Sequence, residues 1–472
     1  MFIHKALDFT ETYVEAVNNA LMGIDEEAEL SKAQKEWLAF CLTGIIVNNE
    51  ICWSKMEKSS LGDHTVAALS WMFRNAKITW PILLQASTNL LLNKYSITKG
   101  FLVVDDTEKR RAKVTKRLAF IHKIKDKKSG GYIMGQEVVF LLLVTEKITI
   151  PVGFAFYMPD PEYSQWYQND KKLKKEGKEK KQRPEKPKKN PDYPTKQDLA
   201  VKMINEFKQN HPQVQINLAL ADNLYGTKDF MNKIGTVYDK IQTISQLKAN
   251  QIIRFNNKEM TVEEFFRRRP CFSQTLRIRG GEEISVIVYS ARIYVKSHRT
   301  KRFVIALKYP GEKEFRYLVA SDLSWRTCDI LEGQTFRWLV EVFIEDLKSY
   351  EGFGESAKQT DVEGSRNVLI LSLLLDHSLL FHPDQKARIE NKLPAFTVGS
   401  LINHSKVQSF LDFIRHLLSS DDLPQALELL SQSIRRYFKL APSSKHMISR
   451  PLGKLESSPN LKSYAKACLA RG

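Results

Sequence analysis

The hydrophobic period of this chain changes near residue 100. Before that point, apolar side chains recur at spacings of three and four, which is typical of amphipathic helices. Helices are therefore expected at Leu7–Leu21, Lys32–Val47, Ala67–Asn75 and Pro81–Leu92. Beyond it, short runs rich in Val, Ile and Phe predict successive strands. These runs are Phe101–Val104, Arg117–Lys125, Glu137–Val144 and Ile148–Phe156. The chain is therefore expected to be α/β, with a helical N-terminal region.

Two of the expected strands end in an aspartate. Asp105 directly follows Phe101–Val104, and Asp222 follows the expected strand Val214–Ala221, which comes after a helical pattern at Lys196–Gln209. Ligands of open α/β sheets gather at the carboxyl ends of strands. Three strands whose first ends in Asp, followed by a helix and a further strand, are the expected start of an RNase-H-like core.

A third acidic position lies in the expected helix Thr335–Ser349. Arg337, Glu341, Glu345 and Lys348 are spaced so that they align along one stripe of this helix. Taken alone, the stripe is more typical of an ordinary salt-bridged surface helix. Together with two strand-end aspartates it predicts a catalytic site, because phosphodiester cleavage by two metals needs oxygen ligands converging on ions roughly 3.5–4 Å apart.

The stretch between Asp222 and Glu341 reads as β-rich. Strands are expected at Thr243–Leu247, Gln251–Phe255, Gln274–Arg279, Ile284–Val288, Ala291–Val295, Phe303–Leu307 and Phe315–Ala320. A hairpin turn is expected at Gly280–Gly281 and a helix at Val262–Arg269. Later helices are expected at Val362–Phe381, Lys406–Leu418 and Pro424–Tyr437.

These patterns divide the chain into five regions. The expected boundaries are a helical N-terminal region at 1–97, the first part of the core at 98–239, a β-rich insertion at 240–330, the second part of the core at 331–393, and a helical C-terminal region at 394–472.

The net charge of +18 favours a polyanionic partner. Residues 171–190 alone hold eleven Lys or Arg against three Glu, with Leu173 as the only aliphatic residue. Such a run cannot bury apolar surface, so a basic disordered loop is expected at about 160–195. It is either a solvated insertion or an arm that follows phosphates. The nearby Tyr163, Trp166 and Tyr167 favour the second interpretation, because bases stack on aromatic rings.

Several classes of protein are disfavoured. The five cysteines are scattered without a C-x-x-C pair, which argues against a zinc ribbon or a disulfide framework and favours a reducing compartment. No apolar stretch reaches the ~20 residues of a membrane span, so a soluble protein of the cytoplasm, without membrane contact, is expected. No phosphate-binding loop of the G-x4-G-K-[ST] type occurs, which leaves ATP-driven chemistry unsupported.

The acidic set resembles that of the DDE transposases of the large insertion-sequence group, whose glutamate region follows the pattern Tyr-x2-Arg-x3-Glu-x6-Lys. Arg337, Glu341 and Lys348 match both spacings, and Gln334 occupies the Tyr position. Further likeness lies in Asp105–Asp106–Thr107 and in Ala221–Asp222–x2–Tyr225–Gly226. The resemblance covers roughly residues 100–380 and implies a transposase that is active in a bacterial or archaeal cell.

The resemblance also implies a division of labour. Asp105, Asp222 and Glu341 would hold two Mg²⁺ ions, with Mn²⁺ as a substitute, while Arg337 and Lys348 would bind DNA phosphates. Asp106 is the alternative to Asp105, because only one of two successive strand residues can face the site. The implied partners are the element's terminal inverted repeats, target DNA and a second copy of the chain in a synaptic dimer.

The region 1–97 is expected to read the DNA end. Two other functions stay open at this point: a nuclease of the same core that hydrolyses DNA without joining it, and a non-catalytic DNA-binding protein derived from a transposase.

Overall fold

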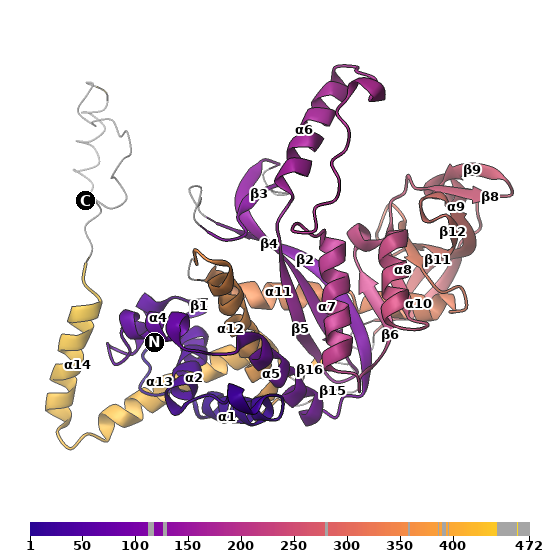
Figure 1. The fold of residues 1–472 in the computed structure, drawn as a ribbon. Coiled ribbons are helices and arrows are strands. Elements are labelled where there is room, and N and C mark those ends of the chain that lie inside the picture. The colour runs from indigo at the N-terminus through magenta and orange to yellow at the C-terminus, as the bar shows by residue number, and fades with distance from the viewer. Residues whose placement is uncertain are drawn as a thin grey trace. The chain divides into compact units, whose positions relative to one another are not determined.

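The computed structural model describes residues 1–111, 118–125, 130–278, 282–356, 359–385, 387–388, 393–394, 396–440 and 460. The chain divides into two compact units, Met1–Leu418 and Ser419–Gly472. The first unit is a mixed α/β structure built on a large mixed sheet, with helices before and after it (Figure 1). No helix in the described part of the chain is long and apolar enough to cross a membrane.

The N-terminal region is helical, which confirms the expectation from its hydrophobic period. Its helices are α1 (Asp8–Met22), α2 (Lys32–Asn48), α3 (Trp53–Ser59), α4 (Val66–Asn75) and α5 (Trp80–Lys94). Helix α2 starts at a capping box, in which the Ser31 hydroxyl accepts from the Gln34 N–H and the Gln34 side chain accepts from the Ser31 N–H. This pairing satisfies two backbone donors that the helix itself leaves open. The short α3 had no counterpart among the expected helices.

The first half of the sheet combines antiparallel and parallel pairs. Its strands are β2 (Lys99–Arg110), β3 (His122–Lys125), β4 (Tyr132–Val144), β5 (Thr149–Tyr157), β6 (Gln215–Ala221) and β7 (Gln242–Leu247). Strand β4 pairs antiparallel with β2, β3 and β5, whereas β2, β6 and β7 run parallel. Residues 112–117 lie outside the described chain, and of the strand expected at 117–125 only His122–Lys125 is a strand, because residues 118–120 form a bend and turn.

The β-rich stretch extends this same sheet. Its elements are β8 (Ile252–Phe255), β9 (Lys258–Thr261), α9 (Val262–Arg267), β10 (Phe272–Arg277), β11 (Glu283–Val295), β12 (Thr300–Lys308) and β13 (Arg316–Ala320). Strand β13 pairs with β7, and the order continues through β12, β11, β8 and β9. The two strands expected at 284–288 and 291–295 are one long strand, β11. The expected turn at Gly280–Gly281 lies outside the described residues.

Helices cover both faces of the first half of the sheet. Helices α7 (Lys196–Asn210) and α8 (Lys228–Val237) pack on one face, and α10 (Thr327–Thr335), α11 (Trp338–Ser349) and α12 (Val362–Phe381) pack on the other (Figure 1). Strand β2 alternates between the two cores, with Leu102 and Val104 in the first and Val103 in the second. This alternation is the pleat of the strand, and it decides where the polar residues that follow will point.

The basic stretch is not simply a loop. Residues Pro161–Lys175 form helix α6 and Lys180–Gln182 form a short 3-10 turn, η2, where a disordered loop was expected. The Asp160 side chain caps α6 by accepting from the backbone N–H groups of Glu162 and Tyr163. No residue of α6 is buried, so tertiary burial did not impose the helix.

The remaining elements close the chain. They are β1 (Glu50–Ile51), β14 (Gly352–Ser356), β15 (Ala387–Arg388), β16 (Leu393–Pro394), α13 (Val398–Leu418) and, in the second unit, α14 (Leu423–Tyr437). Strand β1 pairs in parallel with β14, directly after α11. The expected helices at 362–381, 406–418 and 424–437 are therefore confirmed, with α13 beginning earlier than expected.

Two carboxyl groups are buried where α11 meets α12. Glu351 is completely buried and Asp376 is 6% exposed. Burial raises the pKa of Glu351 well above its ordinary value, and the neighbouring Asp376 adds to the shift. Burial also raises the pKa of Asp376 to about 7. Both groups therefore favour the protonated, uncharged form inside the folded chain.

This pair makes a pH-dependent contribution to stability. A carboxyl group whose pKa is higher in the folded chain stabilises the fold at low pH, and the contribution is lost as pH rises from about 4 to about 7. Glu351→Gln is therefore expected to flatten that pH dependence and to raise the free energy of unfolding at pH 8 by about 1–3 kcal/mol. The free energy of unfolding is measured by urea unfolding from pH 5 to pH 8. The control variant is Glu345→Gln, at an exposed position of α11. An unchanged pH slope in Glu351→Gln would contradict the assignment.

Candidate functional site

The pleat of β2 sends Asp105 and Asp106 to opposite faces of the sheet. Asp105 follows Val104, which pairs with Ala221 of β6, so Asp105 and Asp222 are the next residues along two neighbouring parallel strands. The Asp105 carboxylate accepts a hydrogen bond from Arg337 Nη1 at 3.1 Å. Asp105 therefore faces α11, and Asp106 faces α7.

Arg337 connects the first carboxylate with the third. It is the N-cap residue of α11, and its Nη2 donates to Glu341 one turn further on. Both Arg337 and Asp105 have only 14% of their side-chain surface exposed. Their contact spans 232 positions of sequence. The guanidinium thus lies between the carboxylates of Asp105 and Glu341.

The apolar side of α11 holds this geometry. Leu339, Val340, Phe343 and Leu347 are buried against the core. Two turns beyond Glu341, Lys348 Nζ donates to Thr107 Oγ1 at 2.6 Å, and Thr107 shares the Asp105 face of β2. Glu345 is exposed. Gln334, at the Tyr position of the signature, is buried at the end of α10 with its Oε1 lacking a described partner.

Asp222 is held at the end of β6 by backbone contacts. Its Oδ1 accepts from the Leu224 N–H at 2.7 Å, and its carbonyl oxygen accepts from Ser245 Oγ at 2.5 Å. Asp222 forms no ion pair within the described residues. Burial raises its pKa and the charge of Asp106 adds to that, while the Leu224 N–H, Arg337 and Lys196 act against it.

The pKa of Asp105 is raised to about 6, mainly by its burial, and the charges of Asp222 and Asp106 contribute in the same direction. The Asp106 N–H and Arg337 only partly offset this. Like-charged carboxylates held close together in a partly buried site favour either a proton or a cation between them.

A second polar group lies on the opposite face of β2, and sequence reasoning missed it. Lys196 Nζ, at the start of α7, donates to Asp106 at 2.6 Å and to Glu137 at 3.0 Å. The ring of His122 is 2.9 Å from the other oxygen of Glu137. No motif marked Lys196, because it is one lysine among many beside the basic run. The charge of Lys196 thus balances the negative charge of Asp106, and Asp106 has a different cationic partner from Asp105.

Tyr225 is a buried residue close to the acidic side chains of Asp105, Asp106 and Asp222. Its ring is fully buried, and its hydroxyl has no hydrogen-bond partner in the described chain. Burial raises its pKa, and Asp106, Asp222, Asp105 and Glu137 act in the same direction. The sequence marked this residue only by its place three positions after Asp222.

The carboxylates of Asp105, Asp222 and Glu341 offer oxygen ligands for a divalent metal ion. Carboxylate oxygens suit Mg²⁺, and the negative charge around Asp105 and Asp222 is only partly balanced. In the described chain, however, no three His, Cys, Asp or Glu side chains are grouped closely enough to hold one ion. Arg337 stands between two of the carboxylates instead. The donor set therefore fits the ion in chemistry, but the carboxylates are not grouped around one ion in this structure.

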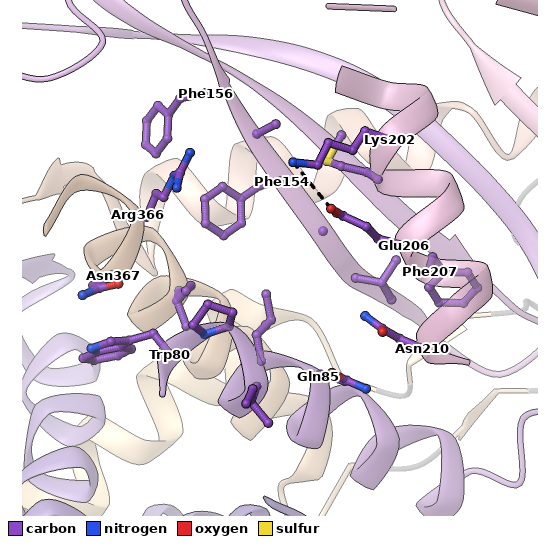
Figure 2. Close-up of a pocket in the computed structure, with 18 of the residues that line it drawn as sticks. Trp80, Gln85, Phe154, Phe156, Lys202, Glu206, Phe207, Asn210, Arg366 and Asn367 are labelled. Atoms are coloured by element: carbon purple, nitrogen blue, oxygen red, sulfur yellow. Dashed lines mark ion pairs between the residues drawn. The ribbon is translucent and has the colours of Figure 1, made fainter. Parts of the chain in front are cut away.

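A large pocket lies away from the acidic residues. It has a volume of about 840 Å³ and lies beside β5, between α5, α7 and α12. Figure 2 shows Trp80 and Gln85 on one wall, Lys202 and Glu206 on another, and Arg366 on a third. None of the acidic residues described above lines it, so the candidate site is defined by charge and not by this pocket.

Comparison with known proteins adds no identity. The sequence matches no family model, and no curated protein is significantly similar to it.

Proposed function

We propose that this chain is a DNA transposase that cuts transposon ends and joins them to target DNA by two-metal phosphodiester chemistry. The observation that carries the proposal is the contact of Arg337 with both Asp105 and Glu341. It joins strand β2 to the glutamate helix, and these are the elements on which such chemistry depends. Asp105 lies in the middle of β2, which continues to Arg110, and not at the strand end expected from the sequence.

The topology supports the same proposal. Strand β4 pairs antiparallel with β2, β5 and β3, and β2, β6 and β7 follow as parallel neighbours, an arrangement that supports an RNase-H-like core. In the proposal, strands β8 to β13 are an insertion between this core and α11. The insertion lengthens the core sheet while α11 returns to pack beside β2.

Each residue has a role in this proposal. Asp105, Asp222 and Glu341 would hold two divalent cations, Mg²⁺ or Mn²⁺, and the bound ions would supply Lewis-acid chemistry at the scissile phosphate. Arg337 releases the carboxylates and binds a phosphate with its bidentate fork, and Lys348 binds another as a point charge. Asp106 stays paired with Lys196 and takes no part in ligation.

The test is a cleavage and joining assay with Mg²⁺, using duplexes that carry the inverted repeats flanking the gene. The proposal expects nicking at the repeat end and transfer of a pre-cut 3′-hydroxyl end to a second duplex. Cleavage without transfer would replace it with a hydrolytic nuclease of the same core. Specific binding without cleavage in Mg²⁺ or Mn²⁺ would replace it with a non-catalytic DNA-binding protein.

Lys348 offers a local prediction. Lys348→Ala is expected to weaken cleavage or end binding about tenfold, because it removes a phosphate-binding charge, and to change the free energy of unfolding by only ~0–1 kcal/mol. Glu345→Ala, on the exposed side of the same helix, is the matched control and should change cleavage much less. Cleavage rates and melting temperatures of both variants distinguish a phosphate-binding role of Lys348 from a structural one. A Lys348→Ala protein that melts early but cuts normally per folded molecule would make the contact with Thr107 purely structural.

A further inference from the structure

The most strongly charged feature outside the acidic site is the segment 161–195, called here the basic arm. It contains α6, η2 and the stretch that returns to α7. Helix α6 stands away from the sheet and the following residues run back along it (Figure 1). Because no residue of α6 is buried, the helix is accessible along its whole length.

The arm is folded by its own contacts. Arg183 Nη1 binds both carboxylate oxygens of Asp170, at 2.9 and 3.1 Å. These two side chains are only 17% and 23% exposed, which is low for a segment without a core. Trp166 Nε1 donates to the Pro184 carbonyl at 2.9 Å. The returning stretch is therefore fastened to one side of α6.

The aromatic rings of α6 lie beside this fastening, because the Tyr163 ring is 5.3 Å from that of Trp166 and Lys186 Nζ of the returning stretch lies 5.4 Å from the centre of the Tyr163 ring. Tyr163 and Tyr167 lie one turn apart with nearly parallel rings, 14° between planes and 6.5 Å between centroids. Lys171 and Lys174 follow Tyr167 on α6, Lys178 lies just beyond the end of the helix, and all three are exposed. None of these three lysines forms an ion pair with a described residue. Their charges are therefore available to an external partner.

The base of the arm is fixed beside the acidic site. The arm ends at Thr195, whose side chain caps α7, and the next residue is Lys196, which binds Asp106. Lys189 Nζ also bonds Asp198 in the first turn of α7, at 2.5 Å. The lysines of α6 are thus carried on a folded segment that is anchored next to Asp106, on the face of β2 opposite Asp105 and Glu341.

We propose that the basic arm is a prefolded clamp for the phosphate backbone of duplex DNA next to the cut site. Lysines bind phosphates by releasing condensed counterions, without a sequence requirement. The arm offers almost no aliphatic surface for insertion into a membrane, since Leu173 is the only aliphatic residue of 171–190. The identity of the nucleic acid rests on the proposed function, and the fold of the arm does not.

The first test measures how DNA binding depends on salt. A triple variant with Lys171, Lys174 and Lys178 changed to Gln is compared with the full chain on one duplex, by fluorescence anisotropy without divalent metal. The slope of log K against log salt is expected to fall by about 0.9 for each phosphate that the variant no longer binds. The matched control changes three exposed lysines of the β-rich stretch, Lys258, Lys301 and Lys313, and should alter the slope less. Equal slopes for the two triple variants would overturn the clamp.

The second test separates a folded clamp from a loose charged tether. Asp170→Asn removes one negative charge, so the arm becomes more positive, and it breaks the ion pair with Arg183. A tether would then bind DNA equally or more tightly, whereas the clamp is expected to bind several-fold more weakly and to become more sensitive to trypsin at its lysines. Tighter binding by this variant would overturn prefolding.

The outcomes for the arm and for the catalytic site are distinguishable. A chain that fails to cut DNA but shows the expected salt slopes would refute the transposase and retain the clamp. If the chain cuts DNA normally and the triple lysine variant leaves the salt slope unchanged, the clamp would be refuted and the transposase retained. Equally tight, arm-dependent binding of single-stranded RNA or of anionic vesicles would reject the assignment to duplex DNA.

Discussion

Asp105→Asn is expected to slow Mg²⁺-dependent DNA cleavage by about 1000-fold or more, which corresponds to about 4 kcal/mol less transition-state stabilisation. The amide keeps the shape of the side chain but removes a charged oxygen ligand beside Asp222. The matched control is Asp106→Asn, which makes the same chemical change one residue further on. Because Asp106 faces α7 and binds Lys196, its variant should retain most of the activity.

This pair of variants decides between the two aspartates that the sequence left open. Both should fold, since each replaces one half-buried polar side chain with another of similar volume. Cleavage rates at saturating Mg²⁺ and melting temperatures are the measurements. If Asp106→Asn were the inactive variant and Asp105→Asn the active one, the face of the sheet assigned to the chemistry would be wrong.

Arg337→Gln is expected to change metal binding and catalysis in opposite directions. Without DNA, the guanidinium occupies the space between Asp105 and Glu341 and supplies the positive charge there. Its removal leaves the carboxylates unbalanced, so Mn²⁺ should bind the DNA-free variant about tenfold more tightly, a change of about 1.4 kcal/mol. Cleavage should nevertheless fall by roughly 100-fold, because glutamine cannot hold a phosphate with a charged bidentate fork.

Calorimetric titration of the DNA-free chain with Mn²⁺ measures the first effect independently of activity. Arg326→Gln is the control, since Arg326 forms an exposed ion pair with Asp329 on the neighbouring helix α10. Mn²⁺ affinity that stays the same or weakens in Arg337→Gln would show that the arginine orients the carboxylates and does not compete with the metal.

Some of this arrangement could be predicted from local pattern. The alternation of β2 already places Asp105 and Asp106 on opposite faces, because the pleat has a period of two. The spacing of Arg337 and Glu341 is one helical turn, so their contact within α11 follows from helix geometry. The capping residues Ser31 and Thr195 likewise mark the starts of α2 and α7.

Other features could not be predicted from local pattern, because they depend on partners distant in sequence. The contact of Arg337 with Asp105 spans 232 positions, and that of Lys196 with Asp106 spans 90. The sequence did not indicate which strand the β-rich stretch pairs with, and the structure shows that β13 pairs with β7 and lengthens the same sheet. The composition of the basic arm predicted a disordered loop, but the arm contains helix α6. The ion pair of Arg183 with Asp170 stabilises it without burial in a core.

The sequence by itself determined the type of most elements and the fact that Asp105 and Asp106 lie on opposite faces of β2. Both follow from hydrophobic period, which acts over a few residues. Only the tertiary structure decided which cation balances each carboxylate: Arg337 for Asp105 and Glu341, and Lys196 for Asp106 and Glu137. The physical reason is that Coulomb energies depend on distance in space and on burial, and neither is encoded in the spacing of residues along the chain.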